Sequence, residues 1–461
     1  MTWDRPGRYP GRMTTTAVLL AAGLGTRMKS TLPKALHGIA GRPMLNHLIE
    51  SCAAVFDRIV VVTGPDMEVV AKAASPHATV VQHDRLGTAH AAQQAAPLFG
   101  DGDVAVLYAD NPLIRPDTLR RLLSARQHSS LAMLVMRPRD PGRYGRVITK
   151  AGQDGYDPDG RDPDGRDQVE RIVEWADATE AERAVPLCNA GVFCASAAEL
   201  VHWLGTVQPS PKGEYYLTDC VAACAAEGGI VRAVEAGEAE LRGINSRSEL
   251  AEAEATVQSW LRRAAMDGGA TLTAPDTVTL CVDTALAPDV IVGPHVVFGP
   301  GVSVASGAEI RPFSHLEGCQ VGEGAIIGPY ARLRPGTVVE RAAHVGNFVE
   351  LKATRLGAGA KANHLSYLGD SVIGPATNIG AGTITCNYDG YGKHRTTIGA
   401  GVFVGTHATL VAPVALGDGS FVAAGSVITQ DVPADAMAFG RATQVEKPGR
   451  AKAYRTAKGA K

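Results

Sequence analysis

The sequence predicts an α/β domain followed by a parallel β-helix. Apolar strands alternate with helical segments over the first half of the chain, which favours a sheet covered by helices on both faces. From about residue 272, aliphatic residues recur every six positions, and short strands joined by tight turns produce that period. Glycine is abundant, at 52 of 461 residues, while aromatic residues make up only 5%. Narrow coils of small residues account for both values.

The composition excludes several classes of protein. The 45 basic and 47 acidic residues give a formal net charge of −2, which offers no electrostatic support for binding nucleic acid. A hydrophobic content of 45% argues against a disordered acidic chain. No apolar run approaches the roughly 18 residues of a membrane span, so we expect no membrane association. The eight cysteines contain no Cys-x-x-Cys pair, and we therefore expect buried thiols in the cytoplasm.

Changes in composition divide the chain into five parts. They are a flexible extension at 1–13, a first domain at 14–245, a helical linker at 246–269, a β-helix at 270–446 and a basic, flexible tail at 447–461. Met13 is a candidate for the true start. Arginines before the apolar stretch 17–22 imitate a signal peptide, but the stretch is short and its end is better explained by a phosphate loop.

The first domain contains predicted strands and helices in alternation. Strands are predicted at 16–21, 57–63, 103–108 and 132–137, and helices at 43–55, 89–96 and 116–126. Unbroken apolar strands of this kind favour a parallel sheet, which binds ligands at the carboxyl ends of its strands.

Two further segments join the predicted elements. Residues 151–168 repeat Asp-Pro-Asp-Gly-Arg and are predicted to be a solvated hairpin tip. A calcium loop through Asp157, Asp159 and Asp162 is the alternative, although the closing glutamate is absent. Residues 246–266 are predicted to be a helix, which begins at a capping box of Ser246 and Glu249 and ends at Gly268-Gly269.

The β-helix follows the period of six with occasional slips. Its inward aliphatic residues are Leu280, Leu286, Val292, Phe298, Val304, Ile310, Leu316, Val321, Ile327, Leu333, Val339, Val345, Leu351, Leu356, Leu368, Ile373, Ile379, Ile398, Val404, Leu410, Leu416, Val422 and Ile428. The segment 385–395 interrupts the rhythm and is predicted to be a loop outside the coil.

A glycine-rich loop follows the first strand. It carries Gly23 and Gly25, then the cations Arg27 and Lys34. A dinucleotide fingerprint would need glycine where Met28 stands, and the Gly-Lys-Ser/Thr of a Walker loop is missing. Backbone N–H groups facing phosphates, together with two cations, suit a leaving pyrophosphate.

The stretch Leu20-Ala-Ala-Gly-Leu-Gly-Thr-Arg-Met, with Pro33-Lys34 after it, resembles the sugar-1-phosphate nucleotidyltransferases. Further matches occur in the family's order at Gln82, Leu86-Gly-Thr88, Leu107-Tyr-Ala-Asp110, Tyr144-Gly145, Ile172-Val-Glu174, Asn189-Ala-Gly191 and Gly243-Ile-Asn245. With the β-helix behind them, residues 16–448 resemble the bifunctional N-acetylglucosamine-1-phosphate uridyltransferases/glucosamine-1-phosphate N-acetyltransferases. The resemblance implies a Rossmann-like mixed sheet, a left-handed β-helix, a homotrimer, and magnesium, UTP and acetyl-CoA as cofactor and co-substrates.

The resemblance also implies residue roles in the first domain. The nucleotide and nucleotide sugar would contact Leu20, Ala21, Ala22, Gly23, Lys34, Gln82, Gly87, Thr88, Asp110, Gly145, Glu174, Asn189 and Asn245. Magnesium would be held by Asp110 and Asn245, and Arg27 and Lys34 would stabilise the departing pyrophosphate. Ala109, Asn111 and the insertion at 151–168 depart from the family's pattern, which puts the affinity for the sugar in doubt more than the reaction type.

Polar residues interrupt the β-helix in one region. N-acetylation needs a base that takes a proton from an attacking ammonium group, and imidazole has a suitable pKa. By resemblance, His364 is this base, oriented by Glu350. Glucosamine-1-phosphate would bind Arg334, Lys352, Tyr367 and Asn378, and acetyl-CoA would bind Ala381, Asn387, Tyr388, Thr406, Ala424 and Arg441. Thr406 replaces the serine that is common in the family.

Two other functions stay open. The first is a single-function sugar-1-phosphate nucleotidyltransferase whose β-helix is only structural; the cluster of His364, Lys352 and Asn387 argues against it, because a structural coil needs no such cluster. The second is a non-enzymatic regulatory subunit, which Arg27 and Lys34 argue against.

Overall fold

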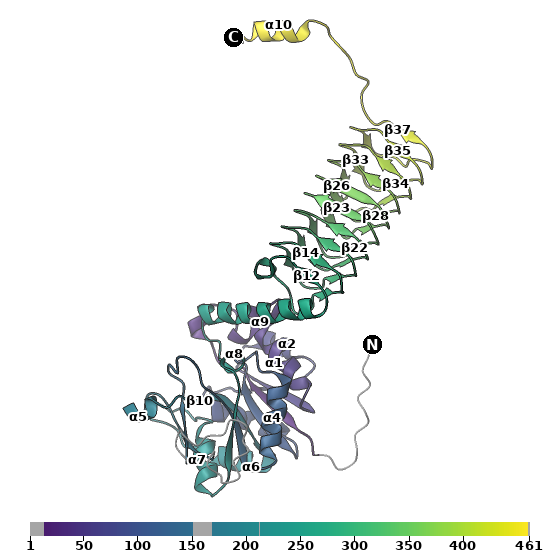
Figure 1. Cartoon of the computed structure of the whole chain (residues 1–461). Coiled ribbons are helices and arrows are strands. Elements are labelled where there is room, and N and C mark those ends of the chain that lie inside the picture. The colour runs from purple at the N-terminus through teal and green to yellow at the C-terminus, as the bar shows by residue number, and fades with distance from the viewer. Residues whose placement is uncertain (1–12, 151–167, 212, 460–461) are drawn as a thin grey trace. The chain divides into compact units, whose positions relative to one another are not determined.

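The computed structural model describes residues 13–150, 168–211 and 213–459, arranged as two compact units, Met1–Val257 and Gln258–Lys461 (Figure 1). The predicted extension at 1–13 lies outside these residues except for Met13, and so does the insertion at 151–168, with its alternative calcium loop, except for Gln168. In the described residues, no helix is both long enough and apolar enough to cross a membrane.

The first unit is built on a mixed sheet with the strand order β11-β7-β10-β6-β1-β4-β5. Its strands are β1 (Thr16–Leu20), β4 (Arg58–Thr63), β5 (Ala78–Val81), β6 (Asp103–Tyr108), β7 (Leu131–Met136), β10 (Cys188–Ser196) and β11 (Val231–Glu235). The central strands are parallel, but β10 runs antiparallel to both β6 and β7. The mixed sheet that the resemblance implied is therefore confirmed, and the parallel sheet expected from the apolar pattern alone is corrected, since burial on both faces produces that pattern in either direction.

Shorter strands and the helices complete this unit. The remaining strands are β2 (Gly38–Ile39), β3 (Arg42–Pro43), β8 (Arg146–Thr149) and β9 (Val169–Val173). The helices are α1 (Met44–Ala53), α2 (Glu68–Ala74), α3 (Thr88–Ala95), α4 (Pro116–Arg126), α5 (Glu180–Arg183), α6 (Ala197–Thr206), α7 (Asp219–Ala226) and α8 (Glu238–Leu241). Apolar clusters lie on both faces of the sheet, which is why β1 is buried along almost its whole length.

Helix α9 (Arg247–Asp267) follows, with the predicted capping box at its start. Glu249 N donates to Ser246 Oγ, and the Glu249 carboxylate accepts from Ser246 N at 2.8 Å. In the second unit, the Gln258 side chain donates to Leu280 O and accepts from Leu280 N, and Arg262 donates to Val278 O. The second half of α9 thus satisfies backbone groups of the first coil.

The second unit is a parallel β-helix, and its described residues form three parallel sheets, one on each side (Figure 1). The first sheet contains β12 (Thr271–Leu272), β14 (Ile291–Val292), β17 (Glu309–Ile310), β20 (Ile326–Ile327), β23 (His344–Asn347), β26 (Lys361–His364), β29 (Asn378–Ile379), β32 (Phe403–Val404), β35 (Phe421–Val422) and β37 (Met437–Ala438). The second contains β13 (Ala285–Leu286), β16 (Ser303–Val304), β19 (Cys319–Val321), β22 (Thr337–Val339), β25 (Arg355–Leu356), β28 (Ser371–Ile373), β31 (Thr396–Ile398) and β34 (Val414–Leu416). The third contains β15 (Val297–Phe298), β18 (His315–Leu316), β21 (Arg332–Leu333), β24 (Glu350–Lys352), β27 (Tyr367–Gly369), β30 (Ile384–Cys386), β33 (Thr409–Val411) and β36 (Val427–Ile428).

The predicted inward positions form the core of this unit. All are buried except Leu286, which is partly buried and packs against the others. Ala362 and Thr385 fill the two places where the aliphatic pattern lapses, and both are buried. The predicted loop at 385–395 starts two residues too early, because Thr385 and Cys386 belong to β30; residues 387–395 connect β30 to β31.

The basic tail contains a helix, and the cysteines are free. The tail was expected to be flexible, but Arg450–Ala457 form helix α10, whose residues are all exposed. Without an apolar face, this helix leaves no amphipathic pattern to detect. All eight cysteines are free, and seven are buried. Burial raises the pKa of Cys220 to about 12, so that thiol stays protonated and unreactive.

Candidate active sites

A cavity of about 380 Å³ opens at the carboxyl ends of β1 and β6. Eleven predicted residues line it: Leu20, Ala21, Ala22, Gly23, Arg27, Lys34, Gln82, Gly87, Thr88, Asp110 and Asn245. Segments far apart in the sequence therefore converge here, as expected for an α/β sheet.

Two cations and two oxygen ligands meet in this cavity. Lys34 Nζ lies 2.5 Å from Asp110 Oδ2 and 2.9 Å from Asn245 Oδ1. Arg27 Nη2 also donates to Asn245 Oδ1, at 2.9 Å. The Asp110 and Asn245 oxygens thus both contact the Lys34 ammonium, and a divalent cation would need two oxygens that converge in this way.

The donor chemistry suits magnesium. This ion prefers oxygen ligands and is usually held by one or two carboxylates, with water and substrate phosphates completing its shell. In the part of the chain that the structure describes, no group of three or more His, Cys, Asp or Glu side chains is placed to hold a metal ion. Asp110 and Asn245 therefore fit an ion that binds together with a nucleotide.

Gly25 allows the close approach of Lys34 to the loop. Its φ is +62°, and a Cβ at this position would lie 2.5 Å from Lys34 Cβ. Any other residue would strain the backbone and displace the lysine. The glycine thus places Lys34 beside Asp110.

A second polar cluster holds the loop before α3. The buried Gln82 donates from Nε2 to Gly87 O at 3.0 Å, and Thr88 Oγ1 accepts from Leu217 N at 3.0 Å. Arg85, which sequence reasoning missed, donates from Nε to Ala22 O at 2.9 Å and also lines the cavity. Arg85 therefore ties the loop after β1 to the loop before α3.

Of the predicted sugar-binding residues, Glu174 lines a second cavity of about 560 Å³, which shares Thr88 and Tyr108 with the first. Asn189 N donates to Gly145 O at 2.9 Å, and a Cβ on Gly145 would lie 3.6 Å from the Glu174 carboxylate. Burial raises the pKa of Glu174, against a lowering hydrogen bond from Thr218. These contacts bring Gly145, Glu174 and Asn189 together.

Three further residues near these cavities are the two departures from the family's pattern, Ala109 and Asn111, and the unpredicted Trp175. Asn111 is buried and donates to Leu241 O, so its departure from the family's pattern fixes the connection to α8. Ala109 is buried as well. Trp175, which the sequence analysis did not identify, lines the cavity of about 560 Å³. The Arg183 guanidinium lies 4.5 Å from the centroid of the Trp175 ring.

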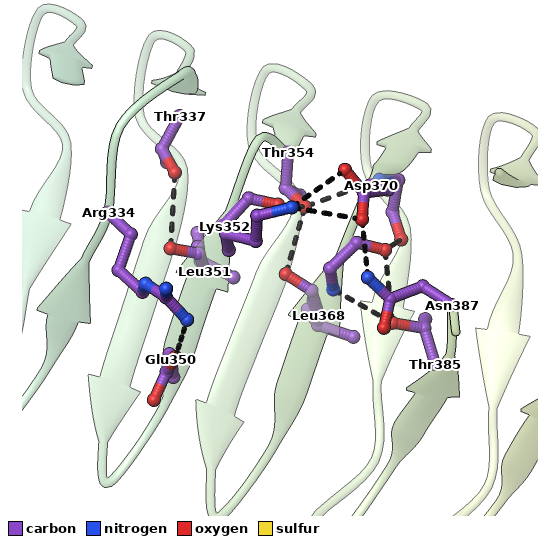
Figure 2. Close-up of polar contacts among 12 residues, drawn as sticks. Arg334, Thr337, Glu350, Leu351, Lys352, Thr354, Leu368, Asp370, Thr385 and Asn387 are labelled. Atoms are coloured by element: carbon purple, nitrogen blue, oxygen red, sulfur yellow. Dashed lines mark hydrogen bonds and ion pairs between the residues drawn. The ribbon is translucent and has the colours of Figure 1, made fainter. Parts of the chain in front are cut away.

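The second site lies on the third sheet of the β-helix, where β24, β27 and β30 follow one another (Figure 2). Lys352 Nζ lies 3.1 and 3.2 Å from the two carboxylate oxygens of Asp370, and Asn387 Nδ2 donates to the same carboxylate. A Cβ on Gly369 would lie 2.5 Å from Tyr367 Oη and 2.7 Å from Asn387 Nδ2. The structure therefore gathers Lys352 and Asn387 around Asp370, a residue that the sequence reasoning did not single out, and brings Tyr367 and Asn387 together over Gly369.

The partners of His364 and Glu350 differ from the expectation. His364 Nδ1 lies 2.7 Å from Asn347 Oδ1, which belongs to the neighbouring coil. Glu350 forms an ion pair with Arg334 at 2.9 Å. No hydrogen bond between Glu350 and His364 occurs in the described residues, so the orienting group is Asn347. The expectation of Glu350 rested on the resemblance alone.

Four of the residues predicted to bind acetyl-CoA follow strands of the first sheet on successive coils: Ala381, Thr406, Ala424 and Arg441. His407 N donates to Ala381 O, and Gly425 N donates to Thr406 O at 2.8 Å. Arg441 Nη1 donates to Ala424 O at 2.7 Å. Asn378 lies one strand beyond β26, paired with Lys361, and Tyr388 is exposed at the start of the loop. The structure thus places these residues along a shared stretch of the β-helix.

Comparison with known proteins gives matches to both units. Residues 17–150 match the family described as MobA-like NTP transferase domain, and residues 395–430 match that described as bacterial transferase hexapeptide (six repeats). "Bifunctional protein GlmU" of Gluconacetobacter diazotrophicus is 66% identical over 96% of this chain and 95% of its own length. The proteins of the same name from Granulibacter bethesdensis and Acidiphilium cryptum are 63% and 61% identical, over 95% and 97% of this chain and 95% and 100% of their own lengths.

Proposed function

This chain belongs to the family of bifunctional GlmU proteins, and from this premise we propose that it makes UDP-N-acetylglucosamine in two reactions. The β-helix transfers an acetyl group from acetyl-CoA to glucosamine-1-phosphate. The first unit then transfers uridylyl from UTP to N-acetylglucosamine-1-phosphate and releases pyrophosphate. The enzyme is thus both a nucleotidyltransferase and an N-acetyltransferase.

In uridylyl transfer, the phosphate of the sugar attacks the α-phosphorus of UTP in line. No protein nucleophile is needed, so positioning and charge neutralisation provide the catalysis. Arg27 and Lys34 offset the charge of the departing pyrophosphate, and Gln82 and Thr88 hold the base. Asp110 and Asn245 would hold magnesium, which would neutralise charge on the phosphates. Gly145, Glu174 and Asn189 hold the acetamido sugar.

In acetyl transfer, the amino group of glucosamine-1-phosphate attacks the thioester carbonyl. A nitrogen–carbon bond forms, the carbon–sulfur bond breaks, and CoA leaves as its thiol. With Nδ1 of His364 held by Asn347, Nε2 is free to take the proton from the attacking nitrogen. Arg334, Lys352, Tyr367 and Asn378 bind the amino sugar phosphate, while Ala381, Asn387, Tyr388, Thr406, Ala424 and Arg441 bind acetyl-CoA.

The observation that carries the second activity is the gathering of Lys352, Tyr367 and Asn387 on adjacent strands. The test is thiol release from acetyl-CoA with and without glucosamine-1-phosphate, in the absence of UTP. We expect sugar-dependent release that His364→Ala abolishes. The control is His315→Ala, which changes an exposed histidine of β18 in the third sheet and should keep the activity. A folded chain that releases no thiol would instead be a single-function uridylyltransferase.

We also propose a cytoplasmic homotrimer. The free thiols, seven of them buried, suit a reducing compartment. The hexapeptide repeat is typical of β-helices that form trimers. Light scattering coupled to size-exclusion chromatography should give a molar mass three times that of the 48.1 kDa chain. A monomeric mass with full acetyl-transfer activity would contradict the trimer.

A further inference from the structure

Asp370 lies at the centre of the polar contacts on the β-helix (Figure 2). It follows β27 directly and has a φ of +50°. Its carboxylate accepts two contacts from Lys352, 18 residues earlier, and one from Asn387, 17 residues later. One side chain thus joins three successive coils.

The two partners of Asp370 serve different substrates in the proposed reaction. Lys352 is assigned to the phosphate of the amino sugar, and Asn387 to acetyl-CoA. A lysine ammonium on a flexible stem has no fixed position unless a partner holds it. The Asp370 carboxylate supplies that partner, and the side chains of Lys352 and Asp370 are only 20% and 21% exposed.

The backbone around Asp370 is fixed from both sides. Gly369 N donates to the buried Thr385 Oγ1 at 2.8 Å, and Ser371 Oγ donates to Gly369 O at 2.8 Å. Burial acts to raise the pKa of Asp370, but hydrogen bonds from Asn387 and Lys352 outweigh this effect and lower it. The carboxylate is therefore charged and held in place before substrate arrives.

We propose that Asp370 is a positioning residue that fixes Lys352 and Asn387 in one arrangement and so couples the sugar-phosphate and acetyl-CoA subsites. This inference rests on the proposed acetyl transfer. Asp370 touches neither reacting atom in this role; it acts through its two partners. Loss of the carboxylate charge should therefore impair the use of both substrates.

Asp370→Asn tests this role with little disturbance to the backbone. Asparagine has the same shape and tolerates the left-handed conformation that Asp370 adopts. We expect kcat/KM for glucosamine-1-phosphate and for acetyl-CoA to fall about 10- to 100-fold each, the range expected when a binding group is misplaced by up to about 1 Å. The thermal midpoint should stay close to that of the wild type.

Asp418→Asn is the matched control. Asp418 is exposed and also bridges two coils, with its carboxylate accepting from Ala400 N at 2.7 Å, but it contacts none of the residues assigned to substrate. It should keep wild-type acetyl transfer. Equal losses in Asp370→Asn and Asp418→Asn would show a general effect on the coil and would overturn the proposal.

A mutant cycle separates positioning from simple structural support. If Asp370 acts through its partners, adding Asp370→Asn to a Lys352→Ala/Asn387→Ala background should lower the affinity for either substrate less than about twofold. Calorimetric binding of glucosamine-1-phosphate and acetyl-CoA gives this readout even when turnover is too slow to measure. The inference would be refuted if Asp370→Asn lowered substrate affinity as much in the Lys352→Ala/Asn387→Ala variant as in the wild type. Wild-type kinetics of Asp370→Asn alone would also refute it. Absence of sugar-dependent thiol release in the wild type would instead refute the proposed acetyl transfer.

Discussion

Gly369→Ala should damage the acetyl-transfer site without straining the fold. The φ of Gly369 is outside the left-handed region, so alanine can adopt its backbone conformation. The added Cβ would lie 2.5 Å from Tyr367 Oη and 2.7 Å from Asn387 Nδ2, whereas an ordinary contact begins at 3.4 Å. The hydroxyl must therefore move by about 0.9 Å and the amide by about 0.7 Å. Displacements near 1 Å in a binding site can cost about 100-fold in rate.

The assay is thiol release at varied glucosamine-1-phosphate and acetyl-CoA, with a thermal melt of the same sample. We expect kcat/KM to fall about 100-fold and the melt to change little. Gly392→Ala is the control, because its added Cβ would have no neighbour closer than 3.8 Å. Wild-type acetyl transfer by folded Gly369→Ala would refute the reasoning that Tyr367 and Asn387 converge over this glycine.

Three further predictions concern the first unit and the core of the β-helix. Arg85→Ala removes the hydrogen bond to Ala22 O. In an assay of pyrophosphate release, the KM for UTP should therefore rise roughly 5- to 10-fold, as expected for the loss of about 1–1.5 kcal/mol. An unchanged KM would show that the Arg85 hydrogen bond does not position the loop after β1 for UTP. Because burial raises the pKa of Glu174, its carboxylate takes up a proton at a higher pH than an exposed glutamate does, and the KM for N-acetylglucosamine-1-phosphate should rise on acidification from that higher pH. Glu174→Gln should remove this pH dependence, and a profile identical to that of the wild type would exclude Glu174 as its source. Leu351 is fully buried, so Leu351→Ala should lower the free energy of unfolding of the β-helix by about 2–5 kcal/mol in denaturant melts, whereas the exposed Val427→Ala should change it by less than about 0.5 kcal/mol.

Most inward residues of the β-helix could be predicted individually, because each side of a coil needs one inward aliphatic side chain, and these recur about every six residues in the sequence. The rule of aliphatic inward residues missed Ala362 and Thr385, which are buried although neither is a large aliphatic residue; Thr385 was assigned to the loop for this reason. Strand direction in the first unit could not be predicted in the same way. The antiparallel β10 is apolar along its length, and a strand buried on both faces has the same pattern in either direction.

The contacts within the second site were only partly predictable. Resemblance supplied Lys352, Asn387 and His364 but neither Asp370 nor Asn347. A signal for both existed, because the coils that carry these residues span about 17 residues. Asp370 lies 18 residues after Lys352, and Asn347 lies 17 residues before His364. Polar residues one coil apart stack on each other, so the coil length predicts which of them can pair.

The contacts of α9 with the first coil limit how the protein can assemble. The end of a parallel β-helix presents backbone groups to which another strand can add, and such open edges promote growth into fibres. Gln258 occupies the backbone N–H and carbonyl of Leu280, and Arg262 occupies the carbonyl of Val278. At these positions a second chain finds no free partner, so the helix hinders end-to-end polymerisation at the start of the β-helix.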